Sequence, residues 1–258
     1  MTLSPHSHVV LDDKGNAYAS QDIQPGAEVE IAPCIIVPAR GRLSAFRTES
    51  PIYKAAYVWN PETDEIGLGM GLLALYGYSL DPNTVVEPDH QNRVLRAKAV
   101  RLIRSGEHLT RIQQFNGHED ETEPLPPLSI DAVKTHPVEV RKSKWGLGVF
   151  ATEDIPADGI VENCPVTLIG PEDRFKAARL GLKNYVYSWQ KNGKGVPETV
   201  GMALGYGGIY NHSSSDDNIT FRYDFEGERI EFFARRDIAK GSELFHNYGW
   251  GDGDKRLR

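Results

Sequence analysis

Apolar and β-branched residues along this chain fall into short runs that are separated by Gly, Pro and Asp. Runs of this length and composition are typical of strands bounded by turns. The clearest runs lie at 148–155, 159–169, 218–225 and 229–238. The pattern therefore predicts a mostly β protein.

Helical patterns are fewer. Pro171 followed by two acidic residues predicts a helix start, because proline fits the first turn and acids favour its dipole. Phe175, Ala178 and Leu182 would share one face of that helix. The glycine-rich segments 69–78 and 201–210 fit a short helix and a buried turn equally well. We therefore expect an α+β fold with short helices.

The residue pattern of the first half returns in the second half. The matching segments are 15–37 with 147–169 and 69–78 with 201–210 at an offset of 132 residues, and 83–109 with 218–244 at an offset of 135. Identical residues at these offsets include Glu30 with Glu162 and Asn83 with Asn218. A match that keeps its register over this length predicts a tandem duplication.

The duplication predicts two domains, at 1–116 and 138–258. Between them, residues 117–137 are rich in acidic residues and proline and have no helix or strand period, which is typical of a linker. The alternative is that 1–116 is an unrelated β-rich domain that shares only the usual residues of strands and turns.

Composition narrows the class of protein. Of the 258 residues, 40% are hydrophobic and 25% charged, as in globular proteins. No run reaches the ~18 apolar residues of a membrane helix and the first residues lack signal-peptide features, so we expect a cytoplasmic protein. The net charge of −7 argues against direct nucleic-acid binding and fits a basic partner better. With only Cys34 and Cys164, we expect two buried thiols, no disulfide and no metal.

Four motifs follow one another in the second half. They are Gly146-Leu147-Gly148, Tyr185-Val186-Tyr187, Asn211-His212, and the run Glu243-Leu244 with Tyr248. In this order they resemble the SET-domain family of lysine methyltransferases over about residues 138–252. The resemblance implies a SET fold of the β-clip type with a C-terminal pseudoknot, and S-adenosylmethionine as cofactor.

The resemblance also implies which residues hold the cofactor. Main-chain groups around the glycine motif would bind its methionine part, since glycine lets a backbone approach closely. The Asn-His pair would contact its amino group and adenine, and a tryptophan would stack on adenine. The residues so assigned are Trp145, Gly146, Leu147, Gly148, Asn211, His212 and Trp250. The structural alternatives are a hairpin bend, a core histidine and an aromatic cap at the chain end.

Tyr248 is the first catalytic candidate by the same resemblance. Methyl transfer is an in-line displacement, so the protein has to align the amine with the methyl group and stabilise charge. A lysine amine is protonated at neutral pH, and an apolar channel would favour its neutral form. Tyr185, Tyr187 and Phe245 are candidate substrate-binding residues, although the alternation at 185–189 fits core packing equally well.

His246 departs from the family pattern, which has Phe or Tyr two positions before the catalytic tyrosine. We treat His246 as a second catalytic candidate, because an imidazole could contact the amine, narrow the channel or bind a water. The number of methyl groups transferred therefore stays open. Ser214 stands where the motif often has cysteine, which fits relatives without zinc.

The first copy lacks these motifs at the offsets of the repeat. The position of the glycine motif is occupied by Lys14-Gly15-Asn16, that of Asn211-His212 by Ser79-Leu80, and that of Tyr248 by Gln113. We therefore expect a degenerate, non-catalytic SET-like domain that packs on the second copy or forms one wall of the substrate groove.

The function predicted from the sequence is S-adenosylmethionine-dependent N-methylation, with a protein lysine ε-amine as the first choice of acceptor. One alternative is an enzyme of the same cofactor that acts on a small-molecule amine or another small substrate. The other is a module that binds the cofactor or a protein without catalysis. The sequence leaves the oligomeric state open.

Overall fold

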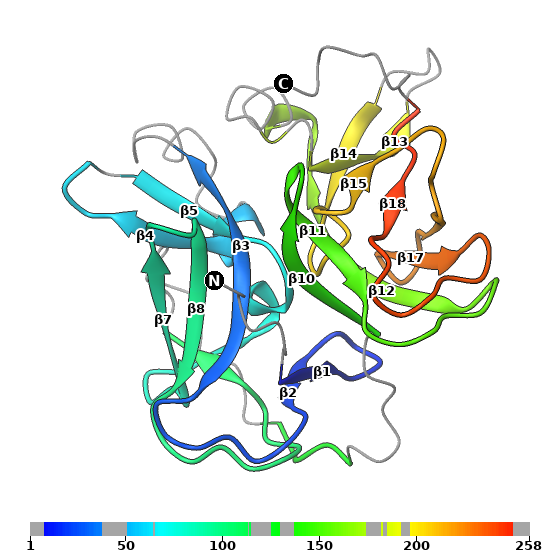
Figure 1. Ribbon diagram of the computed structural model, residues 1–258. Coiled ribbons are helices and arrows are strands. Elements are labelled where there is room, and N and C mark those ends of the chain that lie inside the picture. Colours follow the sequence, from blue (N-terminus) through cyan, green and yellow to red (C-terminus); the bar gives the residue numbers. More distant parts are fainter. Residues whose placement is uncertain are drawn as a thin grey trace.

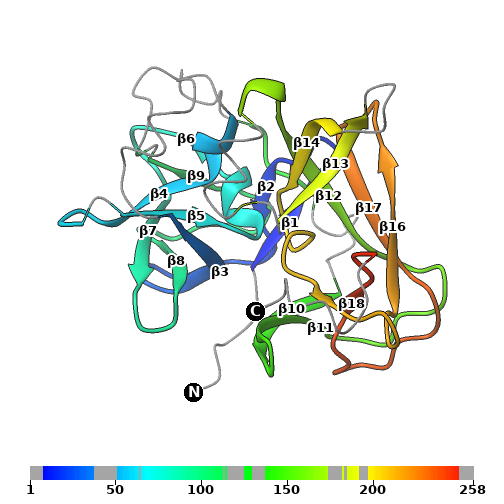
Figure 2. The same ribbon diagram turned by 90° about the horizontal axis from the view of Figure 1, so that it is seen from above.

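The computed structural model describes residues 8–37, 51–63, 65–112, 114, 125–129, 137–173, 182, 185–191 and 197–249. These residues form two curled β-sheets that lie side by side, with the β1–β2 hairpin beside both (Figures 1 and 2). No helix in this part of the chain is long and apolar enough to cross a membrane. The prediction of a mostly β protein is confirmed.

The first sheet has the strand order β4-β5-β3-β8-β7, with antiparallel neighbours. Two short pairs accompany it, antiparallel β1–β2 and parallel β6–β9. The elements are β1 (Val9–Leu11), β2 (Ala17–Ala19), β3 (Glu28–Val37), the 3-10 helix η1 (Pro51–Ala55), β4 (Ala56–Asn60), β5 (Glu65–Gly69), the 3-10 helix η2 (Leu72–Leu75), β6 (Gly77–Tyr78), β7 (Thr84–Asp89), β8 (Val94–Ala99) and β9 (Thr110–Arg111).

The second sheet repeats this order as β13-β14-β12-β17-β16 and continues into β18 and β15. β18 runs parallel to both β15 and β16, and β10–β11 forms a separate hairpin. The elements are β10 (Val138–Ser143), β11 (Gly146–Ala151), β12 (Ile160–Ile169), β13 (Val186–Lys191), β14 (Pro197–Ala203), β15 (Asn211–His212), β16 (Ile219–Asp224), β17 (Arg229–Ala234) and β18 (Phe245–His246).

The four predicted strands correspond to β11, β12, β16 and β17. The two glycine-rich segments differ from each other: 69–78 contains η2, whereas 204–210 is irregular. Of the predicted helix, residues 171–173 are helical and Leu182 is buried, while 174–181 lies outside the described residues. Cys164 is fully buried and Cys34 half-buried, and both thiols are free. Burial raises the pKa of Cys34 to about 12, so this thiol acts as an apolar packing group.

The two halves share one of the three hydrophobic cores. The first half contributes Val37, Ile52, Tyr53, Ala55, Ala56, Ile66, Leu68 and Ala74, and the second half contributes Ile169, Leu182, Met202 and Leu204. Gly71 and Gly205 also pair across the boundary through main-chain hydrogen bonds of 2.9 and 3.0 Å. Each large apolar side chain contributes about 1.5–3 kcal/mol when buried, so this boundary is a packed interior rather than a loose contact.

A buried glutamate occupies the same place in each sheet. Glu30 on β3 accepts hydrogen bonds from the Leu72 amide and the Tyr76 hydroxyl, at 2.7 and 3.2 Å. On β12, Glu162 likewise accepts hydrogen bonds from one main-chain amide and one tyrosine hydroxyl. Each glutamate is only 1% exposed. Its hydrogen bonds connect the strand to the segment that follows β5 in the first half and β14 in the second half.

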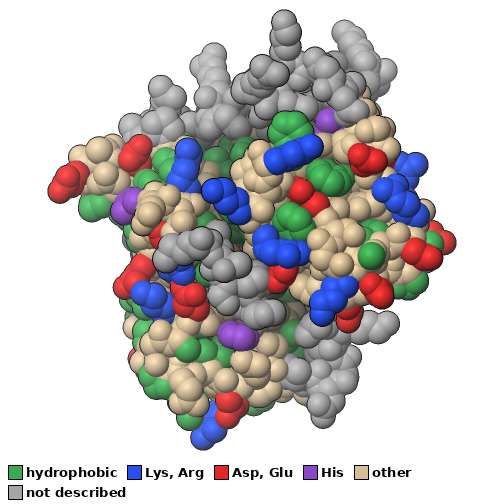
Figure 3. All heavy atoms as spheres, in the orientation of Figure 1, with side chains coloured by type: hydrophobic (Ala, Val, Ile, Leu, Met, Phe, Trp, Pro, Cys, Tyr) green, Lys and Arg blue, Asp and Glu red, His purple; other side chains and the backbone are tan. Residues whose placement is uncertain are grey.

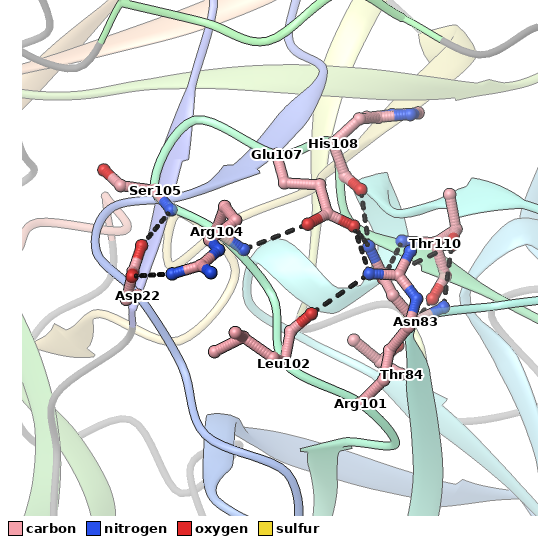
Figure 4. A network of polar contacts seen from close by, with 10 residues as sticks. All are labelled: Asp22, Asn83, Thr84, Arg101, Leu102, Arg104, Ser105, Glu107, His108 and Thr110. Atoms are coloured by element: carbon pink, nitrogen blue, oxygen red, sulfur yellow. Dashed lines mark hydrogen bonds and ion pairs between the residues drawn. The ribbon is translucent and has the colours of Figure 1, made fainter.

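Asn83 and Asn218 also make matching contacts. Asn83 donates to the His108 carbonyl at 2.8 Å and accepts from the Thr110 amide at 2.8 Å, within the polar network of Figure 4. Asn218 donates to the Glu243 carbonyl and accepts from the Phe245 amide at the same distances. In each half one asparagine side chain therefore holds the segment that leads into the short parallel strand.

Strand pairing corrects one detail of the predicted repeat. β5 places Gly69 opposite Cys34, and β14 places Ala203 opposite Val166. Because Cys34 and Val166 are 132 residues apart, the counterpart of Gly69 is Ala203, two residues beyond the predicted Gly201. The shift arises because the two halves have hairpin loops of different length, which a surface loop tolerates easily.

The same shift changes the counterpart of Asn211-His212. Parallel pairing places β6, and therefore Gly77 and Tyr78, where the second half has β15. The predicted replacement by Ser79-Leu80 is therefore wrong by two residues. Gln113 lies outside the described residues.

Stability is expected to depend on the protonation of Glu30. Burial raises its pKa to about 7, so the folded state keeps a proton that the unfolded chain loses near its usual value of 4.5. The free energy of unfolding should therefore fall by about 3 kcal/mol between about pH 4.5 and 7 through this group. Glu30→Gln should remove this fall in urea unfolding measured from pH 5 to 8. Glu226→Gln, at an exposed turn, should keep it, and an unchanged pH dependence in Glu30→Gln would contradict the assignment.

Candidate active site

The glycine motif lies in the β10–β11 hairpin. Gly146 has a φ of 113°, a conformation that favours glycine, and nothing lies within 4 Å of where its Cβ would be. Trp145 is 63% exposed, with the Lys144 ammonium 4.8 Å from its ring centre. The hairpin therefore presents main-chain groups and an indole at an open position.

Glycine is needed at position 148 for a different reason than at position 146. A Cβ at Gly148 would lie 2.4 Å from Glu243 Oε1, so glycine is required for this carboxylate to reach the hairpin. Glu243 Oε1 also accepts a hydrogen bond from Asn211 Nδ2 at 2.8 Å, and its Oε2 accepts one from the Ser143 hydroxyl at 2.9 Å. At Gly148 the structure shows close approach of the protein's own carboxylate, and the role of Gly148 in cofactor binding stays a prediction.

Asn211 connects the hairpin to the C-terminal segment. Besides its bond to Glu243, Nδ2 donates to the Leu147 carbonyl at 3.0 Å. Asn211 and His212 form β15, which pairs in parallel with Phe245 and His246 of β18. Two segments that are more than thirty residues apart in sequence are thus joined beside the glycine motif.

His212 and Tyr248 are in direct contact. The Tyr248 amide donates to His212 Nδ1 at 3.1 Å, and the two rings lie 5.2 Å apart. A backbone N–H can only donate, so Nδ1 is the acceptor and the proton of the neutral imidazole is on Nε2. The nearby His246 carbonyl, 3.3 Å from Nδ1, is then a close neighbour rather than a hydrogen-bond partner.

The Tyr248 hydroxyl donates to the main-chain carbonyl oxygen of Tyr210. Burial raises the pKa of Tyr248 to about 12, with a further contribution from Tyr185. The phenol is therefore protonated throughout the physiological range. Its one proton is donated to the Tyr210 carbonyl, and a phenol oxygen can in addition accept hydrogen bonds.

His246 is 6% exposed and lies among aromatic rings. Its ring centre is 5.0 Å from that of Phe221, 5.5 Å from Tyr248, and 6.3 Å from both Tyr187 and Phe232. Burial, with a smaller contribution from His212, lowers the pKa of His246 to about 4. Its Nδ1 has no hydrogen-bond partner among the described residues. The site therefore contains a neutral imidazole with a buried, unsatisfied nitrogen next to Tyr248.

The remaining candidate residues differ in how closely they contact this cluster. Tyr187 uses its hydroxyl within the core, where it donates to the Gly207 carbonyl at 2.6 Å, while its ring faces His246. Tyr185 contributes electrostatically to the raised pKa of Tyr248. Phe245 is half-buried on β18 and, among the described residues, makes no ring contact with this cluster. Trp250 lies outside the described residues.

The structure thus brings together the glycine motif, Asn211, His212, His246 and Tyr248. It also adds two residues that the motifs did not indicate, Tyr210 and Glu162. The only signal for Glu162 was its identity with Glu30 in the repeat, which shows a shared structural position but no link to the site.

Comparison with known proteins agrees with this arrangement. A profile of the SET domain matches residues 146–249. A curated relative from Schizosaccharomyces pombe, a histone-lysine N-methyltransferase specific for H3 lysine 37, is 31% identical over 115 residues, which are 44% of this chain and 74% of that protein.

Two solved structures are also similar. A histone methyltransferase of Plasmodium falciparum is 28% identical over 47% of this chain and 100% of its own, with a TM-score of 0.37. A chain of the Chaetomium thermophilum polycomb repressive complex 2 is 27% identical over 48% of this chain and 16% of its own, also with a TM-score of 0.37. Because these scores are below 0.5, the assignment rests on the sequence matches. The chain belongs to the SET-domain family, the S-adenosylmethionine-dependent protein lysine methyltransferases.

Proposed function

We propose that this protein methylates a lysine in a basic segment of a protein, with a histone H3 tail as the first substrate to test, and that Tyr248 is its catalytic residue. The observation that carries the proposal is the meeting of three distant segments. Asn211 Nδ2 donates a hydrogen bond to the Leu147 carbonyl at 3.0 Å, and the Tyr248 amide donates one to His212 Nδ1 at 3.1 Å. One place on the molecule therefore has an open glycine hairpin, an asparagine amide and a protonated phenol.

The residues at this place fit S-adenosylmethionine. Trp145 and the main chain at Gly146 are accessible, and no hydrogen bond among the described residues uses Asn211 Oδ1, which leaves an acceptor for an amino group. We assign Trp145, Gly146, Leu147, Asn211 and His212 to cofactor binding. When bound, the cofactor supplies an electrophilic methyl group on a sulfonium sulfur.

The chain's own residues then favour the neutral form of the acceptor amine and orient it. The aromatic rings around His246 give the site a low dielectric, which favours the neutral amine over the ammonium ion. The Tyr248 oxygen accepts a hydrogen bond from the amine and so orients its lone pair. A neutral His246 adds no positive charge that would oppose the sulfonium. Tyr185, Tyr187 and Phe245 remain proposals for the channel wall.

The choice of a histone tail comes from the relative and from charge. The S. pombe relative is named for H3 lysine 37. This chain has a net charge of −7, which suits a basic substrate. On the face shown in Figure 3, acidic and basic side chains of the described residues are interspersed, unlike the uniformly positive surface that nucleic acid requires.

We further propose that the halves are copies of one unit, with domains at 1–116 and 138–258 and a linker at 117–137. The matching strand orders and the paired contacts of Glu30 with Glu162 support this. The first copy would be non-catalytic, packed on the second as a pseudo-dimer. The knot-like crossing of the family stays a prediction for the region where the Asn211 and Tyr248 segments meet.

Asn211→Ala should weaken cofactor binding about tenfold, equivalent to about 1.4 kcal/mol, because the Leu147 carbonyl and Glu243 lose the amide that bridges them. Calorimetric titration with S-adenosylmethionine measures this. Asn92→Ala, which removes a side-chain hydrogen bond from a turn of the first half, should bind normally. Equal affinities in both variants would remove Asn211 from the cofactor site.

Transfer of a labelled methyl group tests the substrate. Purified protein is incubated with histone H3 and, separately, with a cell lysate that is then split into protein and small-molecule fractions. Label on H3 lysine is expected. Label in the small-molecule fraction alone would replace the protein substrate with a small amine, and cofactor binding without any transfer would indicate a binding module.

A further inference from the structure

Glu162 and Tyr210 form a buried pair behind Tyr248. The Tyr210 hydroxyl donates to Glu162 Oε2 at 2.9 Å, and the Tyr206 amide donates to Glu162 Oε1 at 2.8 Å. Tyr210 and Glu162 are each 1% exposed. The carbonyl oxygen of the same Tyr210 accepts the hydroxyl of Tyr248. Tyr210 is thus held by its side chain and, through its main chain, holds the catalytic phenol.

The segment before Tyr210 needs such a restraint. It contains Gly205, Gly207 and Gly208, and glycine allows many backbone conformations. At Gly205 the backbone has a φ of 116°, and a Cβ would lie 2.5 Å from Glu162 Oε1. The turn therefore folds closely around the carboxylate. Glu162 holds this turn at both the Tyr206 amide and the Tyr210 hydroxyl, so its loss would loosen the segment that carries the Tyr210 carbonyl.

The position of that carbonyl controls the Tyr248 hydroxyl. A phenol has one proton, and the direction in which it donates decides where its lone pairs point. A small misplacement of an orienting group reduces a rate strongly, because the reacting atoms are no longer aligned. We propose that Glu162 is a positioning residue, which acts through Tyr210 to set the orientation of the Tyr248 hydroxyl. This inference rests on the proposed role of Tyr248.

The chain contains a matched control. In the first half, Tyr76 donates to Glu30 Oε2 at 3.2 Å, and both residues are buried. Tyr76→Phe and Tyr210→Phe therefore each remove one buried hydroxyl from one buried glutamate. Only the second pair leads to a catalytic tyrosine, because the first half has glutamine at the corresponding position 113.

The two full-length variants are compared in steady-state methyl transfer and in thermal unfolding. Tyr210→Phe should lower kcat about tenfold, with KM for the cofactor within about twofold of wild type. Tyr76→Phe should leave kcat within about twofold, while its melting temperature falls as much as that of Tyr210→Phe. Equal kcat values in the two variants would overturn the proposal.

Glu162→Gln adds a conservative variant. Its amide keeps an acceptor for Tyr206 and a polar group for the Tyr210 hydroxyl, so its kcat should lie between those of wild type and Glu162→Ala. A Glu162→Gln activity as low as that of Glu162→Ala would count against positioning by these hydrogen bonds. If Glu162→Ala does not fold, the tyrosine pair decides alone.

A measurement without turnover separates this inference from the proposed function. Tyrosines labelled at Cζ give one carbon signal each in NMR, and the signal of Tyr248 is the one missing from Tyr248→Phe. This signal should shift in Tyr210→Phe and stay in place in Tyr76→Phe. An unmoved Tyr248 signal in Tyr210→Phe overturns the inference, even where wild-type protein methylates no substrate.

Discussion

Tyr248→Phe should reduce methyl transfer at least about 100-fold while cofactor affinity stays near normal. The substitution removes only the hydroxyl. That oxygen donates its proton to the Tyr210 carbonyl, and the side chain is half-buried. The ring itself remains packed on His212 and His246, so the fold of the site should persist.

Single-turnover transfer to histone H3 and calorimetric titration with S-adenosylmethionine separate chemistry from binding. Tyr223→Phe is a suitable control, because Tyr223 belongs to the same sheet and stacks on Phe225 at 5.1 Å. Its ring lies 5.2 Å from Phe221, and among the described residues no ring contact joins it to His246 or Tyr248. Its activity should be close to that of wild type. Unchanged turnover in Tyr248→Phe would remove the phenol from the mechanism.

Deletion of residues 1–136 should abolish the fold of the catalytic half. The deletion would expose Ile169, Leu182, Met202 and Leu204, which lie in the core shared by both halves. At about 1.5–3 kcal/mol for each side chain, the loss is about 6–12 kcal/mol, comparable with the whole stability of a domain. The Gly71–Gly205 pairing would be lost as well.

Circular dichroism melts and solubility of a 137–258 fragment measure this loss. Supplying residues 1–130 as a separate chain should restore a cooperative melt and methyl transfer, because the shared core can form between two chains. A fragment that is soluble, melts cooperatively and has full activity alone would show that the first half is dispensable.

The motif order alone predicted candidate site residues that the structure brings together. Gly146, Asn211, His212 and Tyr248 were predicted from short, recognisable patterns whose residue types are set by chemistry. The strands of the second half were equally visible, because their apolar and β-branched residues form bounded runs. The sequence also predicted a repeat, which stays a proposal, and strand pairing shows that the predicted register was wrong by two residues at Gly69, where loop lengths differ.

Other features depend on tertiary contacts that the motifs did not indicate. Glu162 looks like any polar residue within a strand, and only the turn that closes over β12 makes it the acceptor of two hydrogen bonds. The neutral state of His246 depends on rings from β13, β16 and β17, which are far from it in sequence. The close approach of the Glu243 carboxylate to Gly148 could likewise be seen only once the structure placed the hairpin beside the C-terminal segment.

The sequence by itself therefore determined the family, the mostly β architecture and the candidate site residues, because these depend on local patterns and residue types. Tertiary structure decided how those residues are held. Burial, protonation and the direction of a hydroxyl depend on which distant segments pack together, and at this site those segments are the 146–148 hairpin, β12, the 204–210 turn and the C-terminal run through Tyr248.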